Sequence, residues 1–197
     1  SVNNGTLSNC ADSGATGLNL PKGIALNSDS TYAFITNNNS TVTQCSVSSG
    51  TLSNCGSSGT MKLYSPRGIV LNPAGTYAFI ANSNRNTVSQ CSVNNGTLSN
   101  CSETGSIFNS PYGIALNSTG TYALITNNGN SSISQCSINN GTLSNCVNTR
   151  VTQLNSPSGI TINPAGTYAF ITAGGNKVFQ CSVNNGSLSN CAQTGFQ

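Results

Sequence analysis

The chain is built from one repeated stretch, and this repetition constrains its fold more than any other feature of the sequence. Residues 66–82 read PRGIVLNPAGTYAFIAN, and similar copies occupy residues 21–37, 111–127 and 157–173. A second constant unit, Cys-Ser-Val/Ile-x-x-Gly-Thr/Ser-Leu-Ser-Asn-Cys, follows each copy. Its last cysteine recurs every 45 or 46 residues, at Cys10, Cys55, Cys101, Cys146 and Cys191. A period of about 40–50 residues is typical of β-propeller blades, and one repeating array forms one structural unit.

The pattern within each repeat predicts strands. Tyr77 and Phe79 alternate with aliphatic neighbours, which is the period of two expected for a strand. Gly, Pro and Asn interrupt the chain too often for a stable helix. Four short strands are therefore expected in each repeat, and together they would form one antiparallel blade. In the second copy they are expected at 68–72, 76–81, 87–93 and 97–101.

The predicted fold class is all-β, a propeller-type array of four four-stranded antiparallel blades in a single domain over residues 1–197. The expected blades are residues 20–64, 65–109, 110–154 and 155–197, after a partial blade and linker at 1–19. The chain thus carries a surplus hairpin strand at its start. Closure of the ring within one chain is expected first, because loop closure costs little. An eight-bladed ring of two chains and a head-to-tail polymer remain open alternatives.

Eight of the nine cysteines form pairs that bracket a tight turn, and a disulfide is expected across each hairpin, with a β-bulge adjusting the register. The pairs are Cys45 with Cys55, Cys91 with Cys101, Cys136 with Cys146, and Cys181 with Cys191. Cys10 is left over as an unpaired or intermolecular thiol. No zinc site is expected, because the chain has no histidine and no two-residue cysteine spacing. Regular disulfides predict an extracellular or cell-surface location.

Charged residues are scarce, which argues against several classes of function. The chain has six Lys and Arg residues and three Asp and Glu residues, which gives a net charge of +3. Such sparse charges form no basic stripe that could bind nucleic acid. No apolar run approaches the roughly 18 residues of a membrane span. No signal peptide is visible, so a mature or excerpted form is expected. Without histidine, and with Asp12, Asp29 and Glu103 at unrelated positions, neither a triad nor a carboxylate pair is expected. The residues themselves predict no enzyme, no cofactor and no metal.

The copies of one motif carry a family resemblance. Tyr32-Ala33-Phe34-Ile35-Thr36-Asn37, repeated at Tyr77, Tyr122 and Tyr168, resembles the Tyr-Val-Thr-Asn signature of the YVTN/lactonase-like β-propeller repeats. The preceding Pro-x-Gly-Ile-Ala-Leu-Asn-Pro-Ala-Gly-Thr also fits, and the resemblance covers essentially the whole chain. It implies a ring usually of seven or eight blades, a bacterial surface or secreted protein and, in some relatives, hydrolysis of sugar lactones. The polar funnel groups of those lactonases find no residue-by-residue match here.

The copies differ from one another mainly in two kinds of connection. The turns between the first and second strands, and between the third and fourth, are nearly uniform, whereas the other connections vary. In a meandering blade these two kinds lie on opposite faces, so the variable face is expected to bind a ligand or partner. The sharpest candidates would ring the central mouth and hold an anionic or carbohydrate group. They are Lys22, Arg67, Tyr112 and Ser158, with Arg85 and Lys177 as weaker candidates. The repeated tyrosines are expected to pack between blades.

Taken together, the residues predict a non-enzymatic extracellular scaffold or surface-assembly subunit that could polymerise head to tail through its terminal hairpins. One alternative is a carbohydrate or adhesion-type binding propeller that uses the variable face. A second alternative, supported by the family resemblance alone, is a lactonase-like hydrolase. The expected partners are further copies of the chain, as a dimer or polymer, and a glycan or cell-surface molecule. Nucleic acid is not an expected partner.

Overall fold

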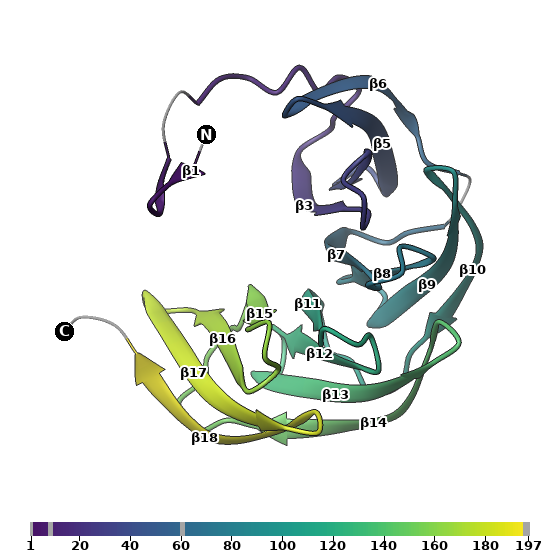
Figure 1. Cartoon of the computed structure of the whole chain (residues 1–197). Helices are drawn as coiled ribbons and strands as arrows, with labels where there is room; N and C mark the ends of the chain where they lie inside the picture. Colours follow the sequence, from purple (N-terminus) through teal and green to yellow (C-terminus); the bar gives the residue numbers. More distant parts are fainter. Residues whose placement is uncertain (1, 8–9, 60–61, 195–197) are drawn as a thin grey trace.

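The computed structural model describes residues 2–7, 10–59 and 62–194, and within them the regular elements are all β-strands (Figure 1). Blade 1 is β3 (Pro21–Leu26), β4 (Tyr32–Asn37), β5 (Thr41–Ser48) and β6 (Thr51–Ser57). Blade 2 is β7 (Pro66–Leu71), β8 (Tyr77–Asn82), β9 (Thr87–Asn94) and β10 (Thr97–Thr104). Blade 3 is β11 (Pro111–Leu116), β12 (Tyr122–Asn127), β13 (Ser132–Asn139) and β14 (Thr142–Arg150). Blade 4 is β15 (Ile160–Ile162), β16 (Tyr168–Ala173), β17 (Lys177–Asn184) and β18 (Ser187–Thr194). The predicted all-β class and the four four-stranded sheets are confirmed.

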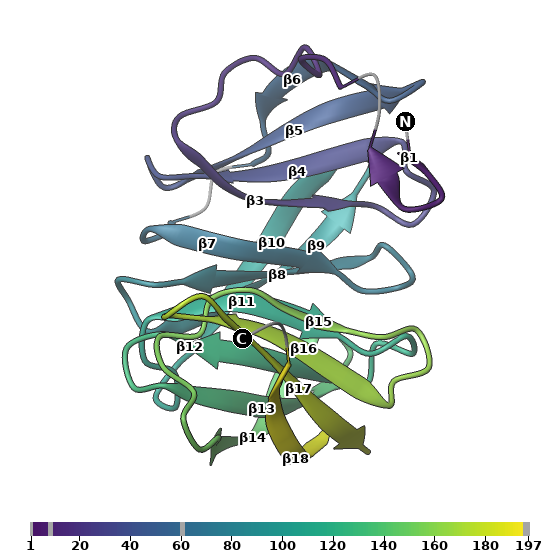
Figure 2. The same cartoon turned by 90° about the vertical axis from the view of Figure 1, so that its left-hand side faces the viewer.

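Each blade is an antiparallel meander whose strands pair in chain order. The first strands β3, β7, β11 and β15 lie on the inner side and contact one another in that order (Figure 1). The blades follow an arc whose first and last blades lie apart, as the perpendicular view also shows (Figure 2). A small hairpin of β1 (Val2–Asn3) and β2 (Thr6–Leu7) forms a separate sheet. The expectation that the ring closes within one chain is therefore wrong: the ends of the arc do not meet.

The strand ends of blade 2 differ from the expected ones by one to three residues, and most at two points. The innermost strand β7 begins at Pro66, which pairs with Asn82, because a proline is tolerated as the first residue of a strand. The outermost strand β10 continues past Cys101 to Thr104, because pairing with β9 resumes beyond an irregularity in register. The outer strands are therefore longer than the turn-to-cysteine pattern suggested.

An asparagine at the end of each innermost strand organises the turn that follows. The Oδ1 atom of Asn72 accepts hydrogen bonds of 2.8 Å from the backbone amides of Thr76 and Tyr77. The amide of Gly75, at φ 69°, donates to the Asn72 carbonyl. Matching amide-to-Oδ1 bonds occur at Asn27, Asn117 and Asn163. The Asn-x-x-Gly-Thr-Tyr part of the repeat is thus an Asx-type turn signal.

The hairpin of the cysteine unit has the predicted turn and bulge. Asn95 and Gly96 have φ values of 45° and 76°, the two positive values that a type I′ turn requires. Asn100, at φ 48°, and Cys101 together face Cys91, because Ser99 pairs with Ser92 and Ser102 with Gln90. This bulge brings the two cysteine Cα atoms to 4.1 Å.

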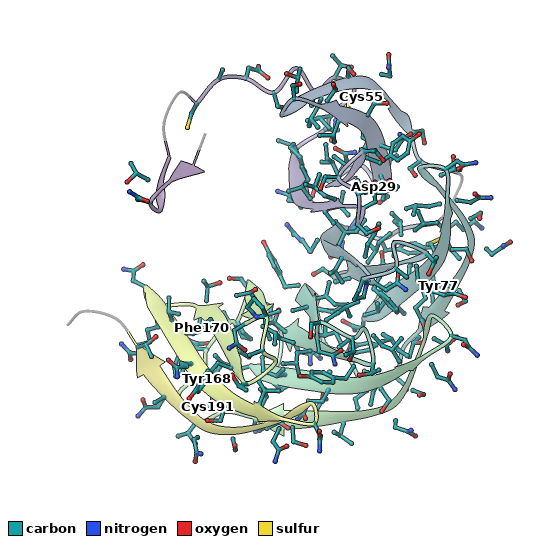
Figure 3. All side chains as sticks on the ribbon, in the orientation of Figure 1. Asp29, Cys55, Tyr77, Tyr168, Phe170 and Cys191 are labelled. Atoms are coloured by element: carbon teal, nitrogen blue, oxygen red, sulfur yellow. A yellow bond between two sulfur atoms is a disulfide. The ribbon has the colours of Figure 1, made fainter. Side chains whose placement is uncertain are left out.

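All four predicted disulfides are present, and each joins the two outer strands of one blade. Figure 3 shows Cys55 and Cys191 on the outer strands of the first and last blades. Cys10 is exposed and has no disulfide partner among the described residues. Four structural disulfides indicate a non-cytoplasmic location. Within the described residues, no helix is long and apolar enough to cross a membrane.

The hydrophobic core lies at the junctions between consecutive blades. Phe34 and Val42 of blade 1 pack with Leu63, Ile69 and Leu71, which belong to blade 2 and the segment before it. Equivalent clusters join Phe79 and Val88 to Phe108 and Ile114, and Leu124 and Ile133 to Leu154 and Ile171. Blades 2 and 3 therefore each contribute one face to the blade before and one face to the blade after.

The repeated tyrosines pack between blades at the three junctions, as predicted. A Cβ atom added to the hairpin glycine Gly96 would lie 2.9 Å from the Tyr32 ring, and Gly141 and Gly186 stand in the same relation to Tyr77 and Tyr122. Burial raises the pKa of Tyr122, whose hydroxyl donates to the Gly166 carbonyl at 3.5 Å. These glycines leave room for an aromatic ring from the preceding blade.

Candidate functional site

The inner edge of the arc is set by the glycine of each Pro-x-Gly segment. A Cβ atom on Gly23 would lie 2.5 Å from the Arg67 carbonyl oxygen, and one on Gly68 would lie 2.6 Å from the Tyr112 carbonyl oxygen. Only a residue without a side chain permits this approach of neighbouring strands. The same relation links Gly113 to the Ser158 carbonyl. The predicted mouth residues therefore follow one another along the inner edge, in the order Lys22, Arg67, Tyr112 and Ser158.

The threonine before the last residue of the signature ties the inner strands together. The hydroxyl of Thr36 accepts from the Gly23 amide at 2.9 Å and donates to the Arg67 carbonyl of the next blade at 2.6 Å. Thr126 makes the same pair of bonds, to the Gly113 amide and the Ser158 carbonyl, at 2.7 and 2.8 Å. The backbone that carries the mouth residues is thus hydrogen-bonded across the blade junctions.

Two of the four predicted mouth residues are in direct contact. The Cζ atom of Arg67 lies 4.9 Å from the centre of the Tyr112 ring, which is a cation–π arrangement. The Nε of Arg67 is buried, and within the described part of the chain it has no hydrogen-bond partner. Lys22 is exposed on the neighbouring strand, and the hydroxyl of Ser158 lies 2.9 Å from the Thr172 hydroxyl. A buried N–H without an acceptor is costly, so an acceptor supplied by a ligand would be favourable here.

The three carboxylates are each engaged elsewhere. Asp29 sits in the first turn of blade 1 (Figure 3), where the hydrogen bond from the Thr31 hydroxyl is the main cause that lowers its pKa. Asp12 accepts a hydrogen bond from the Gly14 amide. Glu103 forms an ion pair with Arg85. No group of His, Cys, Asp and Glu among the described residues could hold a metal ion. The chemistry available at the mouth is therefore cationic and phenolic.

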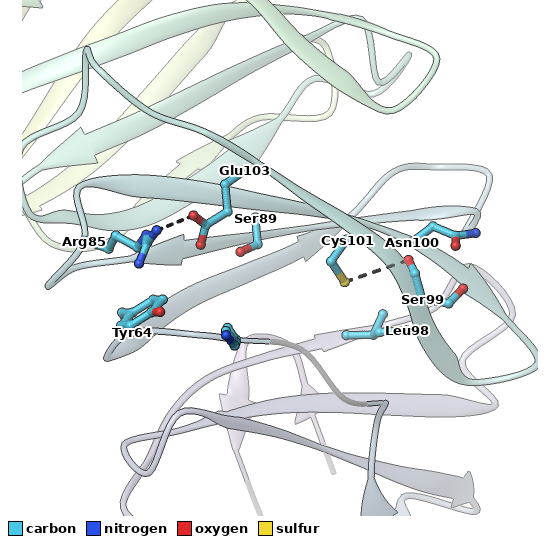
Figure 4. A pocket seen from close by; sticks show the side chains of 9 residues that line it. Tyr64, Arg85, Ser89, Leu98, Ser99, Asn100, Cys101 and Glu103 are labelled. Carbon is cyan, nitrogen blue, oxygen red and sulfur yellow. Dashed lines mark hydrogen bonds and ion pairs between the residues drawn. The ribbon is translucent and has the colours of Figure 1, made fainter.

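A second polar cluster lies away from the mouth, in a pocket of about 300 Å³ on blade 2 (Figure 4). The guanidinium of Arg85 lies 4.5 Å from the centre of the Tyr64 ring, and its Nε is 3.1 Å from Oε2 of Glu103. Leu98, Ser99 and Asn100 of the constant hairpin unit also line this pocket. Arg85 was a weaker candidate from the sequence, whereas Tyr64 and Glu103 were missed. Tyr64 lies in the segment before blade 2, Arg85 in the loop between β8 and β9, and Glu103 on β10, so no regular spacing in the sequence relates them.

The position of Tyr64 depends on a buried asparagine to which the sequence analysis gave no role. Asn82 ends the signature of blade 2; its Nδ2 donates to the hydroxyls of Ser89 and Thr87 at 2.8 and 3.3 Å. Its Oδ1 accepts from the Tyr64 amide at 3.3 Å. In the sequence, the asparagine that ends the signature and the Ser and Thr residues that follow it could have indicated this hydrogen-bonded group. In blades 1, 2 and 3 this asparagine clamps the variable segment before the blade to the blade itself, whereas the signature of blade 4 ends in Ala173.

Comparison with solved structures places the fold among propellers. The chain is similar to a putative 6-phosphogluconolactonase from Bacteroides fragilis, with 16% identity and a TM-score of 0.74 over 88% of this chain and 55% of that one. It is also similar to the periplasmic gluconolactonase of Pseudomonas aeruginosa, with 16% identity and a TM-score of 0.72 over 88% and 53%. The nidogen/laminin complex contains a chain that is 18% identical, with a TM-score of 0.72 over 89% and 64%. The chain spans about half the length of the first solved structures that it resembles. No protein with a curated description matches it.

A family model shows to which protein family the chain belongs. The model described as lactonase, 7-bladed beta-propeller, matches residues 39–195, which is most of the chain. The predictions of a non-enzymatic scaffold or assembly subunit, and of no enzyme, are wrong on this finding. Of the similar structures, one is described as a putative 6-phosphogluconolactonase and another as a periplasmic gluconolactonase. The prediction of no enzyme rested on the absence of histidine and of paired carboxylates, and neither absence excludes membership of this family. This chain belongs to the lactonase family of seven-bladed β-propellers.

Proposed function

We propose that this chain forms part of the substrate-binding mouth of a secreted or cell-surface sugar-lactone hydrolase. The family match supports the reaction class. The observation that carries the proposal is the Arg67 guanidinium, stacked on Tyr112 at the inner edge, with a buried Nε that has no acceptor among the described residues. Exposed Lys22, one inner strand away, supplies a second positive charge for an acidic substituent of the substrate.

The chemistry of lactone opening fits a cation at this place. Water adds to the ester carbonyl carbon and gives a tetrahedral oxyanion. The ring C–O bond then breaks, the ring oxygen takes up a proton, and a hydroxy acid results. Arg67 remains charged at every physiological pH and would stabilise the oxyanion, as preorganised donors do in acyl transfer. Because the chain has no histidine and its carboxylates are engaged elsewhere, the proton of the attacking water is proposed to leave to solvent.

Acid release at constant pH tests this proposal. The substrates are glucono-δ-lactone and its 6-phosphate, each measured against spontaneous hydrolysis in buffer. Arg67→Ala is expected to lower the catalysed rate by about 10²–10³, the loss typical for one oxyanion donor. Arg150→Ala, which removes an exposed cation from the end of the outer strand β14, is the matched control and should keep the rate. Hydrolysis no faster than buffer, or an Arg67→Ala variant as fast as the wild type, would contradict the proposal.

A second candidate function is carbohydrate binding at the blade 2 pocket. The observation that favours it is the grouping of Tyr64, Arg85 and Glu103 in a pocket that Ser89, Ser99 and Asn100 also line. An aromatic ring beside hydrogen-bonding side chains is the usual way to hold a sugar. Glycan-array binding should fall in Tyr64→Ala and Glu103→Gln. Arg150→Ala, in the corresponding groove beside β18, should bind as the wild type does. Equal loss in all three variants, or no binding at all, would exclude this pocket.

A further inference from the structure

All the lysine and arginine residues of the chain lie at the same end of the blades. In each antiparallel meander, this end is formed by the beginnings of the first and third strands, the ends of the second and fourth strands, and the segments that join them. The turns and hairpins of the opposite end, as far as the structure describes them, carry Asp29 and no lysine or arginine. The face so defined, the cationic face, attracts anionic partners. Its cations are Lys22, Lys62, Arg67, Arg85, Arg150 and Lys177.

Two arginines of the cationic face are each stacked on a tyrosine that lies outside the repeated signature. Arg67 stacks on Tyr112, with its Cζ atom 4.9 Å from the ring centre, and Arg85 stacks on Tyr64 at 4.5 Å (Figure 4). A ring that holds a planar guanidinium in place reduces the conformational freedom that is lost when its N–H groups bind a carboxylate. Both arginines are therefore preorganised for an acidic group.

The loop that carries Arg85 is hydrogen-bonded to the segment that carries the other arginine. The backbone amide of Asn84 donates to the Tyr64 carbonyl at 3.3 Å. Tyr64 and Arg67 belong to one continuous segment and are three residues apart, so at most about 11 Å of extended chain separates them. The two stacked pairs are thus neighbours on blade 2, one in the pocket and one at the inner edge.

The same loop also holds the strand that carries Tyr112. The Oδ1 atom of Asn86, the residue after Arg85, accepts a 2.7 Å hydrogen bond from the Ser110 amide. Ser110 immediately precedes β11, whose second residue is Tyr112. One loop therefore fixes the position of both stacked pairs relative to each other.

The spacing and the surroundings of these groups fit an acidic polysaccharide. Duplex DNA carries one charge per about 1.7 Å of its axis, whereas the cations of this face are spread over four blades. Such spacing suits a polymer that carries one carboxylate on each sugar unit. Beside Tyr64, the pocket of about 300 Å³ is also lined by Ser89, Ser99 and Asn100, whose hydroxyl and amide groups can bind sugar hydroxyls. The four disulfides indicate a non-cytoplasmic location, where such polymers occur.

We propose that the cationic face binds an acidic polysaccharide along a track that runs from the Tyr64–Arg85 pair to the Arg67–Tyr112 pair. One carboxylate lies against the Arg85 guanidinium. A later carboxylate of the same polymer accepts from Arg67, whose buried Nε has no acceptor among the described residues. The proposal rests on the carbohydrate-binding candidate at the blade 2 pocket, which becomes one end of a longer site, and it does not depend on lactone hydrolysis.

Isothermal titration calorimetry with oligogalacturonates of increasing length tests the track. Galacturonic acid is the monomer, and malto-oligosaccharides of equal length are the neutral controls. Affinity is expected to rise with length, because the second contact forms within a ligand that is already bound, and to fall at high salt. Arg85→Ala and Arg67→Ala should each weaken binding of the longest oligomer by about tenfold or more, as expected for a lost hydrogen bond to a charged group. Each should also abolish the rise of affinity with length.

Arg150→Ala is the matched control, because it removes an exposed positive charge from the same face but away from the track. It should bind the oligomers nearly as the wild type does. Arg67→Lys keeps the charge but loses the planar group, so it reports on the inner end of the track if Arg67→Ala does not fold. Circular dichroism checks the fold of each variant.

Three outcomes would overturn the proposal. The first is equal binding of neutral and acidic oligomers, or binding of neither. The second is binding of anionic lipid vesicles or of DNA in place of the oligomers. The third is a loss of affinity in Arg85→Ala but not in either Arg67 variant, which would leave sugar binding at the blade 2 pocket without a track. Because binding is measured without turnover, a chain that hydrolyses no lactone can still bind as proposed.

Discussion

The hydroxyl of Thr36 in blade 1 donates a 2.6 Å hydrogen bond to the carbonyl of Arg67 in blade 2, and the same hydroxyl accepts from the Gly23 amide. One side chain therefore fixes the spacing of two innermost strands at the point where the proposed oxyanion donor is attached. The side chain of Thr36 is fully buried, so its bonds cannot be replaced by water without opening the junction.

Removing this hydroxyl should weaken the junction. Thr36→Val keeps the shape but leaves the Gly23 amide and the Arg67 carbonyl short of a partner, so the free energy of unfolding is expected to fall by about 1–3 kcal/mol. Urea denaturation followed by circular dichroism measures the change. Thr152→Val, at an exposed position, is the control and should be nearly neutral. Equal stabilities of the two variants would mean that the Thr36 bonds contribute nothing net.

The buried amide of Asn82 is expected to hold the segment that carries Tyr64. Asn82→Ala removes its bonds to Ser89 and Tyr64 and should lower the free energy of unfolding by about 1–3 kcal/mol. Hydrogen exchange at the Tyr64 amide should become faster than at other backbone amides. A loss of stability of the whole fold would instead speed up exchange at all amides alike. Asn84→Ala, in the exposed loop that follows, is the control. Unchanged exchange at Tyr64 would argue against the clamp.

Replacing a glycine at the inner edge with alanine is expected to destabilise the fold. In Gly68→Ala the new Cβ would lie 2.6 Å from the Tyr112 carbonyl, so the inner strands must move apart at a cost of about 1–3 kcal/mol. Gly56→Ala on β6 meets nothing within 4 Å and should change stability by less than about 0.5 kcal/mol. Thermal and urea unfolding of the two variants should therefore differ clearly. If Gly68→Ala were as stable as Gly56→Ala, the close approach would not be needed.

The hairpin disulfides are expected to stabilise the outer strands. Loss of the Cys91–Cys101 bridge, in the Cys91→Ser/Cys101→Ser double variant, removes a cross-link between residues 10 apart in sequence. The loop-entropy relation gives a loss of roughly 2–3 kcal/mol for a loop of this size. Cys10→Ser, which alters an exposed cysteine outside the four bridges, should be neutral. A larger loss for Cys10→Ser than for the double variant would show that Cys10 has a structural partner.

Several features could be predicted because they are local. The Asn95-Gly96 turn, the bulge at Asn100 and the pairing of Cys91 with Cys101 each follow from residues within one hairpin. The candidate site was predicted in part: Arg67 and Tyr112 do meet, because the repeat places them at equivalent points of neighbouring inner strands. The Tyr64–Arg85–Glu103 cluster could not be predicted, because its members share no period and meet only when one blade is assembled.

The repeat alone determined the strands, the turns and the disulfides, since alternation, positive-φ residues and short loops act within a few residues of one another. The tertiary structure decided which copies of the same motif are buried and which are exposed. Phe79 and Phe170 occupy the same position of the same motif, yet one is buried and the other exposed, because burial depends on whether a further blade packs against it. Contact between blades is non-local and sums over many side chains, so which copies of a motif are buried is decided only when the blades are assembled.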